Sequence, residues 1–199
     1  MAASHLILGF HPYPLAGLRP NVRCKVPSGF RRPARGWHVA VACESHELNA
    51  DNYYPADVLR LLRLTNGAAA VGFTRDGLLR GGNVPAERIA AYALLDVAPD
   101  GTLRRVIEKP DDASFARLAA GMPVSMNVWR LTSEFFQACR DVQPSPRGEL
   151  ELPLAVQYAI DVLGMRFYVV PADAAVLDLS RRSDIPRVAA LLAGFDVAP

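Results

Sequence analysis

Apolar and polar residues alternate in blocks from residue 48 onward, and each block has the length of one strand or one helix. Short apolar runs predict strands at residues 68–74, 89–97, 103–107, 124–130, 167–171 and 175–179, and residues 48–51 are typical of the end of another buried strand. Helical spacing predicts helices at residues 55–66, 110–120, 133–142, 150–163 and 185–193. Strands that alternate with helices indicate an α/β fold with helices on the faces of a sheet.

Turn-forming residues separate these elements. Asp100-Gly101 stands between two apolar runs, which is a strong signal for a β-hairpin. Residues 52–54 are expected to form a turn. Residues 75–87 contain three glycines and a proline, so we expect a loop there. The chain has 199 residues and no internal repeat, which fits one domain or slightly more.

The first 47 residues differ in composition from the rest of the chain. They hold six basic residues against two acidic ones, five prolines and all four histidines. Only residues 5–10 and 37–43 resemble short strands. Three interpretations stay open: a basic arm for an anionic surface, a Pro-rich leader without fixed structure, or a segment outside the native reading frame of the domain. We therefore place a boundary between a leader at 1–47 and a domain at 48–199.

Composition narrows the class of protein. Apolar residues make up 51% of the chain, enough for a core, and no run reaches the roughly 18 apolar residues of a membrane helix. Cys24, Cys43 and Cys139 have neither metal-ligand nor disulfide spacing, and the start lacks the basic segment of a signal peptide. We expect a cytoplasmic protein without a membrane or nucleic-acid partner.

Two aspartates occur where apolar runs end or are interrupted. Asp51 closes the segment Leu48-Asn49-Ala50-Asp51, and Asp178 lies in Val176-Leu177-Asp178-Leu179. A carboxylate in an apolar run is costly to bury unless it is paired or bound to a metal. Mg²⁺ prefers one or two carboxylates together with phosphate oxygens. A turn-forming Asp-Asn pair also explains Asp51, and for this segment taken alone it is the favoured interpretation.

The segment Ile107-Glu108-Lys109-Pro110 directly follows the predicted hairpin. Lys109 is the only lysine after residue 25, whereas the other basic residues of the domain are arginines. This bias suggests a position that needs a compact ammonium group. The alternative is a charged surface pair before a helix that begins with proline. Tyr92-Ala93 lies upstream of the same hairpin.

A third polar segment is Arg147-Gly148-Glu149. Arg147 has the chemistry for a bidentate phosphate contact, whereas acidic residues here would also suit the first turn of a helix. The preceding strand contains Asn127 and Trp129, and we expect Trp129 to lie in the core.

These segments, in this order and spacing, resemble the sugar-phosphate nucleotidyltransferases, such as glucose-1-phosphate thymidylyl- and uridylyltransferases, over residues 48–194. The resemblance implies a Rossmann-like nucleotide-diphospho-sugar transferase fold, with a three-layer α/β/α arrangement around a mixed sheet that is incomplete at the N-terminus. It implies Mg²⁺-dependent joining of a nucleoside triphosphate to a sugar 1-phosphate with release of pyrophosphate. Those two compounds are the expected partners, and a homo-oligomer is compatible with the sequence.

The resemblance also assigns roles to individual residues. Asp51 and Asp178 correspond to the family's magnesium ligands, and Lys109 corresponds to its catalytic lysine at the attacking phosphate. Contacts with the sugar or its phosphate are implied for Tyr92, Glu108, Asn127, Arg147 and Glu149. At the last segment Ser180 and Arg181 replace the family's Gly-Thr.

The family's Gly-x-Gly-Thr-Arg-x-x-Pro phosphate loop has no counterpart in the sequence, where residues 15–20 hold a lone glycine. We therefore expect weak binding of nucleoside triphosphate and slow or no turnover. Three functions compete: a nucleotidyltransferase, a non-catalytic module that binds sugar phosphate or a partner protein, and a metal-dependent glycosyltransferase that uses Asp51. The segment 108–110 favours the first over the third, and the missing loop favours the second over the first.

Overall fold

The computed structural model describes residues 44–108, 121–146 and 148–194, and all structural statements refer to these residues. The predicted helix at 110–120, Lys109, Arg147 and the strand-like residues 5–10 and 37–43 lie outside them.

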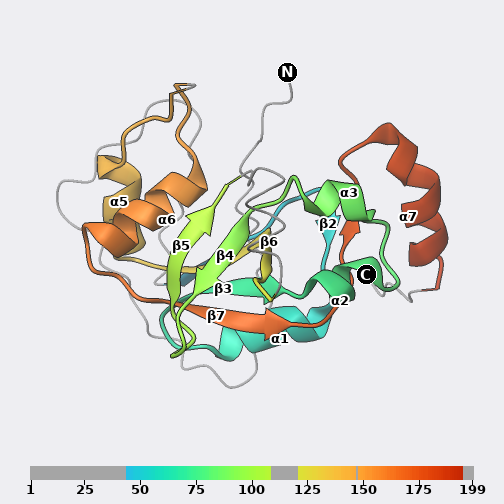
Figure 1. The fold of residues 1–199 in the computed structure, drawn as a ribbon, viewed down its shortest axis with the longest axis horizontal. Helices are drawn as coiled ribbons and strands as arrows, with labels where there is room; N and C mark the ends of the chain where they lie inside the picture. The colour runs from blue at the N-terminus through green and yellow to red at the C-terminus, as the bar shows by residue number, and fades with distance from the viewer. Residues whose placement is uncertain (1–43, 109–120, 147, 195–199) are drawn as a thin grey trace, which may run out of the picture.

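A mixed sheet forms the centre of the domain (Figure 1). Its main path runs β5-β4-β6-β3-β7, and β1 pairs with β6 beside this path. The strands β3 and β7 are parallel, and the other pairs are antiparallel. The bounds are β1 Glu44–Glu47, β3 Ala68–Phe73, β4 Leu94–Val97, β5 Leu103–Ile107, β6 Val124–Thr132 and β7 Phe167–Ala172.

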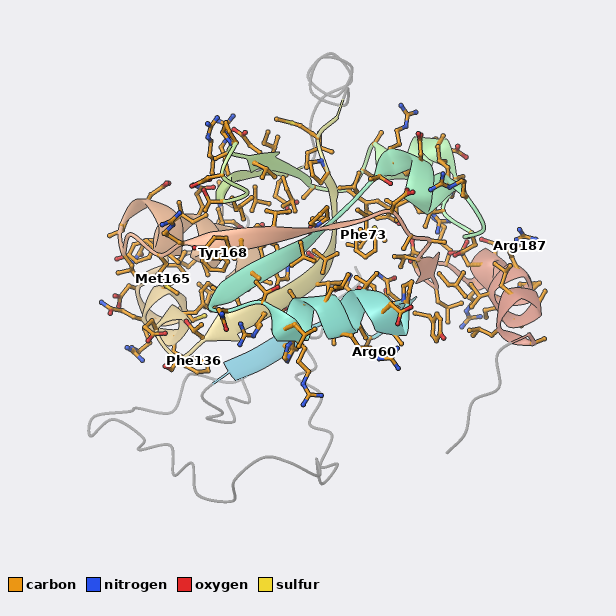
Figure 2. The ribbon with its side chains drawn as sticks, turned by 90° about the horizontal axis from the view of Figure 1, so that it is seen from below. Arg60, Phe73, Phe136, Met165, Tyr168 and Arg187 are labelled. Carbon is orange, nitrogen blue, oxygen red and sulfur yellow. The ribbon has the colours of Figure 1, made fainter. Side chains whose placement is uncertain are left out.

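Helices cover both faces of this sheet. On one face α1 (Ala56–Leu64) packs Val58 and Leu62 onto alternate residues of β3 and β6. On the other face α5 (Phe135–Asp141) and α6 (Leu152–Asp161) enclose a second apolar cluster around Trp129. Figure 2 shows α1 along the sheet, with Arg60 on its outer side. The predicted three-layer α/β fold is confirmed, and so is the core position of Trp129.

The end of the molecule opposite α5 and α6 is built from short elements (Figures 1 and 2). A two-stranded sheet joins β2 to β8 there, with Asn52 opposite Asp178 and Tyr53 opposite Leu177. The bounds are β2 Asn52–Tyr53, α2 Arg75–Leu79, α3 Ala86–Ile89, β8 Leu177–Asp178, the 3₁₀ turn η1 Arg182–Asp184 and α7 Ile185–Leu192.

Strand β6 bends at Asn127, which has a left-handed backbone with φ 56°. Its register on β3 shifts at this point, so that residues 126–128 lie opposite Val71 alone. Before the bend β6 pairs with β4 through Val124, and after the bend it pairs with β1. A bulge of this kind allows one strand to serve two neighbours that diverge.

Four local predictions are wrong. The strand expected at 48–51 is β1 at Glu44–Glu47, so residues before the compositional boundary already pair with β6. Residues 52–54 were expected to form only a turn, but Asn52–Tyr53 is β2. The strand expected at 89–97 begins only at Leu94. Ile89 was counted as a strand residue because it is apolar, but it lies at the end of α3 and packs in the core.

The fourth wrong prediction is the loop at 75–87, which contains α2 and the start of α3. Two of its three glycines allow close packing, whereas Gly81 has the left-handed backbone of a turn. A Cβ on Gly77 would lie 2.5 Å from the Ala174 nitrogen, and one on Gly82 would lie 2.8 Å from the Val176 oxygen. These glycines therefore allow the segment to dock against the chain that leads into β8.

In the part of the chain that the structure describes, every helix is too short or too polar to cross a bilayer.

Glu47 is a buried carboxylic acid at the end of β1. Its exposed fraction is 5%, and its register partner on β6 is Trp129. Burial raises the pKa of Glu47 from 4.5 to about 7. Burial, and then the charge of Glu47, raises the pKa of Cys139 on α5 to about 12. The acid therefore faces the α5 side of the sheet, where its neutral form is favoured.

The free energy of unfolding should fall as the pH rises from about 4.5 to 7. The unfolded chain releases the Glu47 proton at the lower pH, whereas the folded chain holds it until about pH 7, so stability is lost across this window. The loss should be about 3 kcal/mol, at about 1.4 kcal/mol per pKa unit. Urea denaturation at several pH values measures it.

Glu47→Gln should remove this pH dependence, because an amide does not titrate. Asp57→Asn is the matched control, since Asp57 is an exposed carboxylate on α1, and it should keep the wild-type slope. Equal slopes for Glu47→Gln and the wild type would show that Glu47 is not the titrating group.

Candidate active site at the β2–β8 end of the sheet

Asp178 lies at the centre of the polar residues at this end of the molecule. Its exposed fraction is 2%, and both carboxylate oxygens accept hydrogen bonds. The backbone nitrogen of Ser180 donates to Oδ1 over 2.9 Å, and the Ser180 hydroxyl donates to the same oxygen. Oδ2 accepts from Arg88 Nη1 over 3.1 Å and from the Tyr92 hydroxyl. The carboxylate is therefore bound by protein groups from the segment after β8 and from the α3 region.

Arg88 connects Asp178 to a second buried carboxylate, Asp184. Its Nη1 donates to Asp184 Oδ2 over 3.1 Å, and its Nη2 donates to Oδ1 over 2.9 Å. The Arg181 backbone nitrogen also donates to Asp184, over 2.9 Å. One guanidinium thus bridges two carboxylates, the bidentate geometry for which arginine is suited.

These hydrogen bonds determine the ionisation of both acids. Burial raises the pKa of Asp178, but hydrogen bonds from Ser180, Tyr92 and Arg88 outweigh it and hold the pKa below its usual value. The Arg88 hydrogen bonds likewise lower the pKa of Asp184. Hydrogen bonds to Asp184 raise the pKa of Arg88 further. The three groups are charged at neutral pH and stabilise one another.

Asp51 lies in the turn directly before β2, the strand that pairs with β8. The Leu179 backbone nitrogen donates to the Asp51 carbonyl over 2.8 Å, so the two predicted magnesium ligands are neighbours in the backbone. The residue opposite Asp178 is Asn52, however, and directly opposed residues share a face of the sheet. The Asp51 side chain is exposed, whereas that of Asp178 is buried.

A short chain of hydrogen bonds joins β2 to the bend in β6. Asn52 Nδ2 donates to the Tyr54 hydroxyl over 2.9 Å, and that hydroxyl donates to the Met126 carbonyl over 2.6 Å. Asn127, the next residue, is only partly buried. Burial raises the pKa of Tyr54 to about 12, so it remains a donor at neutral pH. The predicted sugar contact Asn127 therefore lies near Asp51 and Asp178.

Tyr92 and Glu108 reach the same end through the β4–β5 hairpin. Leu94 pairs with Ile107, which places Glu108 beside the segment that contains Tyr92. Burial, and then the contact with Asp178, raises the pKa of Tyr92, so that its hydroxyl is protonated and directed at Asp178. Because the Tyr92 hydroxyl already donates to Asp178, a ligand could contact only the ring of Tyr92.

The structure thus brings together Asp51, Tyr92, Glu108, Asn127 and Asp178 from separate segments. Glu149 lies apart, exposed in the loop between α5 and α6, where its carbonyl accepts from the Ser145 nitrogen. Lys109 and Arg147 belong to the residues that are not described.

Magnesium fits this arrangement poorly at Asp178. A carboxylate offers about four lone-pair positions, and four protein donors already use them. Among the described residues, no group of three or more His, Cys, Asp or Glu side chains is arranged to hold a metal. The magnesium role of Asp51 stays a prediction.

Sequence reasoning missed Arg88 and Asn83, which bind Asp178, and Asp184, which binds Arg88. An aspartate in an apolar run signals either a partner or a metal, and the partner lies 90 residues earlier in the chain. Arg88 lies between the expected loop at 75–87 and the expected strand at 89–97, in neither of them. Nothing local to either segment identifies the pairing.

The fold was compared with known proteins. No protein-family model matches the sequence, and no curated protein matches it significantly. A putative glucose-1-phosphate thymidylyltransferase from Bacillus anthracis is similar in structure, with a TM-score of 0.55, 15% identity and 78% of this chain covered. The inositol-1-phosphate CTP transferase from T. maritima has a TM-score of 0.56, 14% identity and 79% of this chain covered.

The similarity concerns the fold. The chain spans 57% of the length of the first neighbour and 60% of the second, less than two-thirds of either. Both neighbours are named as enzymes that transfer a nucleotidyl group to a phosphorylated sugar or polyol. The described domain therefore has the Rossmann-like fold found in nucleotidyltransferases of this kind.

The left-handed backbone at Asn127 predicts that a glycine variant is more stable than an alanine variant at this position. An L-residue with a Cβ is strained in the left-handed region and glycine is not, so Asn127→Ala should unfold more easily than Asn127→Gly by about 1 kcal/mol. Asn66 is an exposed asparagine outside that region, and there alanine should be at least as stable as glycine. Equal stability of the two Asn127 variants in chemical denaturation would contradict the bend.

Proposed function

We propose that the chain acts in nucleotidyl transfer to a sugar 1-phosphate, and that the described domain supplies the half of the site that binds the phosphorylated sugar. The observation that carries the proposal is the convergence of Tyr92, Glu108 and Asn127 at one end of a nucleotidyltransferase-like sheet. These residues come from three segments, and the hairpin and the β6 bend bring them together.

The chemistry of these side chains suits a sugar. Glu108 is exposed, a carboxylate accepts hydrogen bonds from sugar hydroxyls, and the Asn127 amide can both donate and accept. The half-buried ring of Tyr92 supplies an apolar surface for the face of a sugar ring. The left-handed backbone of Asn127 is held by its surroundings, which is common where a side chain must be aimed at a ligand.

In the proposed reaction, an oxygen of the sugar 1-phosphate attacks the α-phosphorus of a nucleoside triphosphate. The new P–O bond forms as the bond to the β-phosphate oxygen breaks, and pyrophosphate leaves. The reaction depends on positioning more than on proton transfer. Glu108 and Asn127 would orient the sugar so that its phosphate points away from the sheet toward the triphosphate.

The second candidate function is a module that binds sugar phosphate without catalysis. The commitment of the Asp178 carboxylate to Arg88, Tyr92 and Ser180 favours it, because that carboxylate has no free position for a metal. Both candidates require the same sugar-phosphate site and differ in the release of pyrophosphate.

Calorimetric titration of the full chain with glucose 1-phosphate tests the shared site. Glu108→Gln should weaken binding about tenfold, because hydrogen bonds to a charged group are worth about 1.5–3 kcal/mol. The control is Glu134→Gln, which changes an exposed carboxylate beside α5 and should leave the affinity unaltered. Absence of glucose 1-phosphate binding by the folded wild type would refute both candidates.

Release of pyrophosphate from UTP, dTTP, CTP or GTP in the presence of the sugar phosphate distinguishes the transferase from the non-catalytic module. Turnover that falls in Glu108→Gln supports the transferase. Binding of the sugar phosphate without turnover supports the module.

A further inference from the structure

The polar contacts of Asp178 indicate which positively charged group neutralises its carboxylate. Its two oxygens accept four hydrogen bonds, two each, from Ser180, Arg88 and Tyr92. These donors account for the acceptor positions that a carboxylate offers. A cation could bind Asp178 only by displacing at least one of them.

Arg88 is the donor that would be hardest to displace. Its side chain is 12% exposed, and three hydrogen bonds fix it between Asp178 and Asp184. If a cation took over Asp178, Arg88 would keep its charge beside that cation in a poorly hydrated site. Two like charges at such a short distance repel each other strongly where water is excluded.

The backbone of Asp178 is fixed as well. The Asn83 side chain accepts from the Asp178 nitrogen over 2.8 Å and donates to the Asp178 carbonyl over 2.6 Å. Asn83 and Arg88 belong to one segment, and Val84 and Ile89 anchor that segment in the core. The Asp178 backbone is therefore fixed to the segment that carries Arg88, and the carboxylate could turn toward Asp51 only by leaving its own donors.

We propose that the Arg88 guanidinium is the permanent counter-ion of Asp178, and that no divalent cation binds at this carboxylate. Asp178 then acts as a positioning residue, which fixes β8, Tyr92 and the α3 segment around the ligand site. The inference rests on the contacts of Asp178 and holds whether or not the domain transfers a nucleotide.

Titration of the full chain with Mn²⁺, with free Mn²⁺ measured by electron paramagnetic resonance, tests this assignment. Asp178→Asn keeps the shape of the side chain and removes its charge. The affinity for Mn²⁺ should be the same in Asp178→Asn and in the wild type. Absence of Mn²⁺ binding in both proteins would agree with the proposal as well. The control is Asp100→Asn, which alters an exposed aspartate paired with Arg166. A fall of about tenfold or more in Asp178→Asn alone would overturn the proposal, since loss of a charged ligand is worth that much or more.

A measurement on the wild type covers the case in which Asp178→Asn does not fold. The ¹⁵N resonance of the Arg88 side chain should stay unchanged in a saturating excess of Mg²⁺, as should that of the exposed Arg166. A shift confined to Arg88 would show that a cation has displaced it and would overturn the assignment. Neither measurement uses a sugar ligand, so their outcome is distinct from that of the proposed function.

Discussion

The bend of β6 at Asn127 is the constraint on which the rest of the domain depends. One nine-residue strand pairs with β3 on one side and, on its other side, with β4 before the bend and β1 after it. A straight strand would continue along one neighbour, so the divergence of β4 from β1 requires the local change of register. The divergence places the hairpin residues Tyr92 and Glu108 at the end where β2 meets β8.

The left-handed backbone at Asn127 is maintained by packing and hydrogen bonding. Met126 and Val128 on either side are buried in the α1-side core, and the Met126 carbonyl accepts from Tyr54. Asparagine is among the residues that tolerate this conformation best after glycine. It also carries a polar side chain, which glycine lacks. One residue thus meets a backbone requirement and carries the amide that we propose as a sugar contact.

Asp178 shows how a buried carboxylate can be stabilised without a metal. Taking a charge out of water is unfavourable unless a partner of opposite charge and further hydrogen bonds compensate for it. Arg88 supplies the charge, and Ser180 and Tyr92 supply the hydrogen bonds. Ser180 is one of the two positions where the sequence departs from the Gly-Thr of the family that it resembles. That departure now has a structural reason, because the serine hydroxyl completes the set of donors.

The sequence predicted the elements whose signals are local. Its predictions were wrong where contacts with distant segments determine the secondary structure. The apolar runs at 68–74, 103–107 and 124–130 correspond to β3, β5 and β6, and the Asp100-Gly101 turn joins β4 to β5. The strand β1 was misplaced because its sequence, Glu-Ser-His-Glu, has no apolar pattern and owes its conformation to β6. The segment 75–87 was mispredicted as a loop because its glycines indicate turns locally, whereas Gly77 and Gly82 allow close contact with a chain nearly 100 residues away.

The sequence pointed to several residues that the fold brings to one end of the sheet, but not to the contacts between them. Asp51, Tyr92, Glu108, Asn127 and Asp178 were each identified from short motifs, and the sheet places them at one end. The pairing of Asp178 with Arg88 was not predictable, because it depends on how α3 docks against β8. A motif can show that a carboxylate needs a partner, but only the fold determines which partner it has.

A crystal structure of the chain with glucose 1-phosphate and Mn²⁺ would test this account most directly. The account predicts electron density for the sugar beside Glu108, Asn127 and the ring of Tyr92, with Arg88 still bound to Asp178 and no anomalous signal for manganese at that carboxylate. Manganese coordinated by Asp178 with Arg88 displaced, or the sugar phosphate bound at another part of the domain, would contradict it.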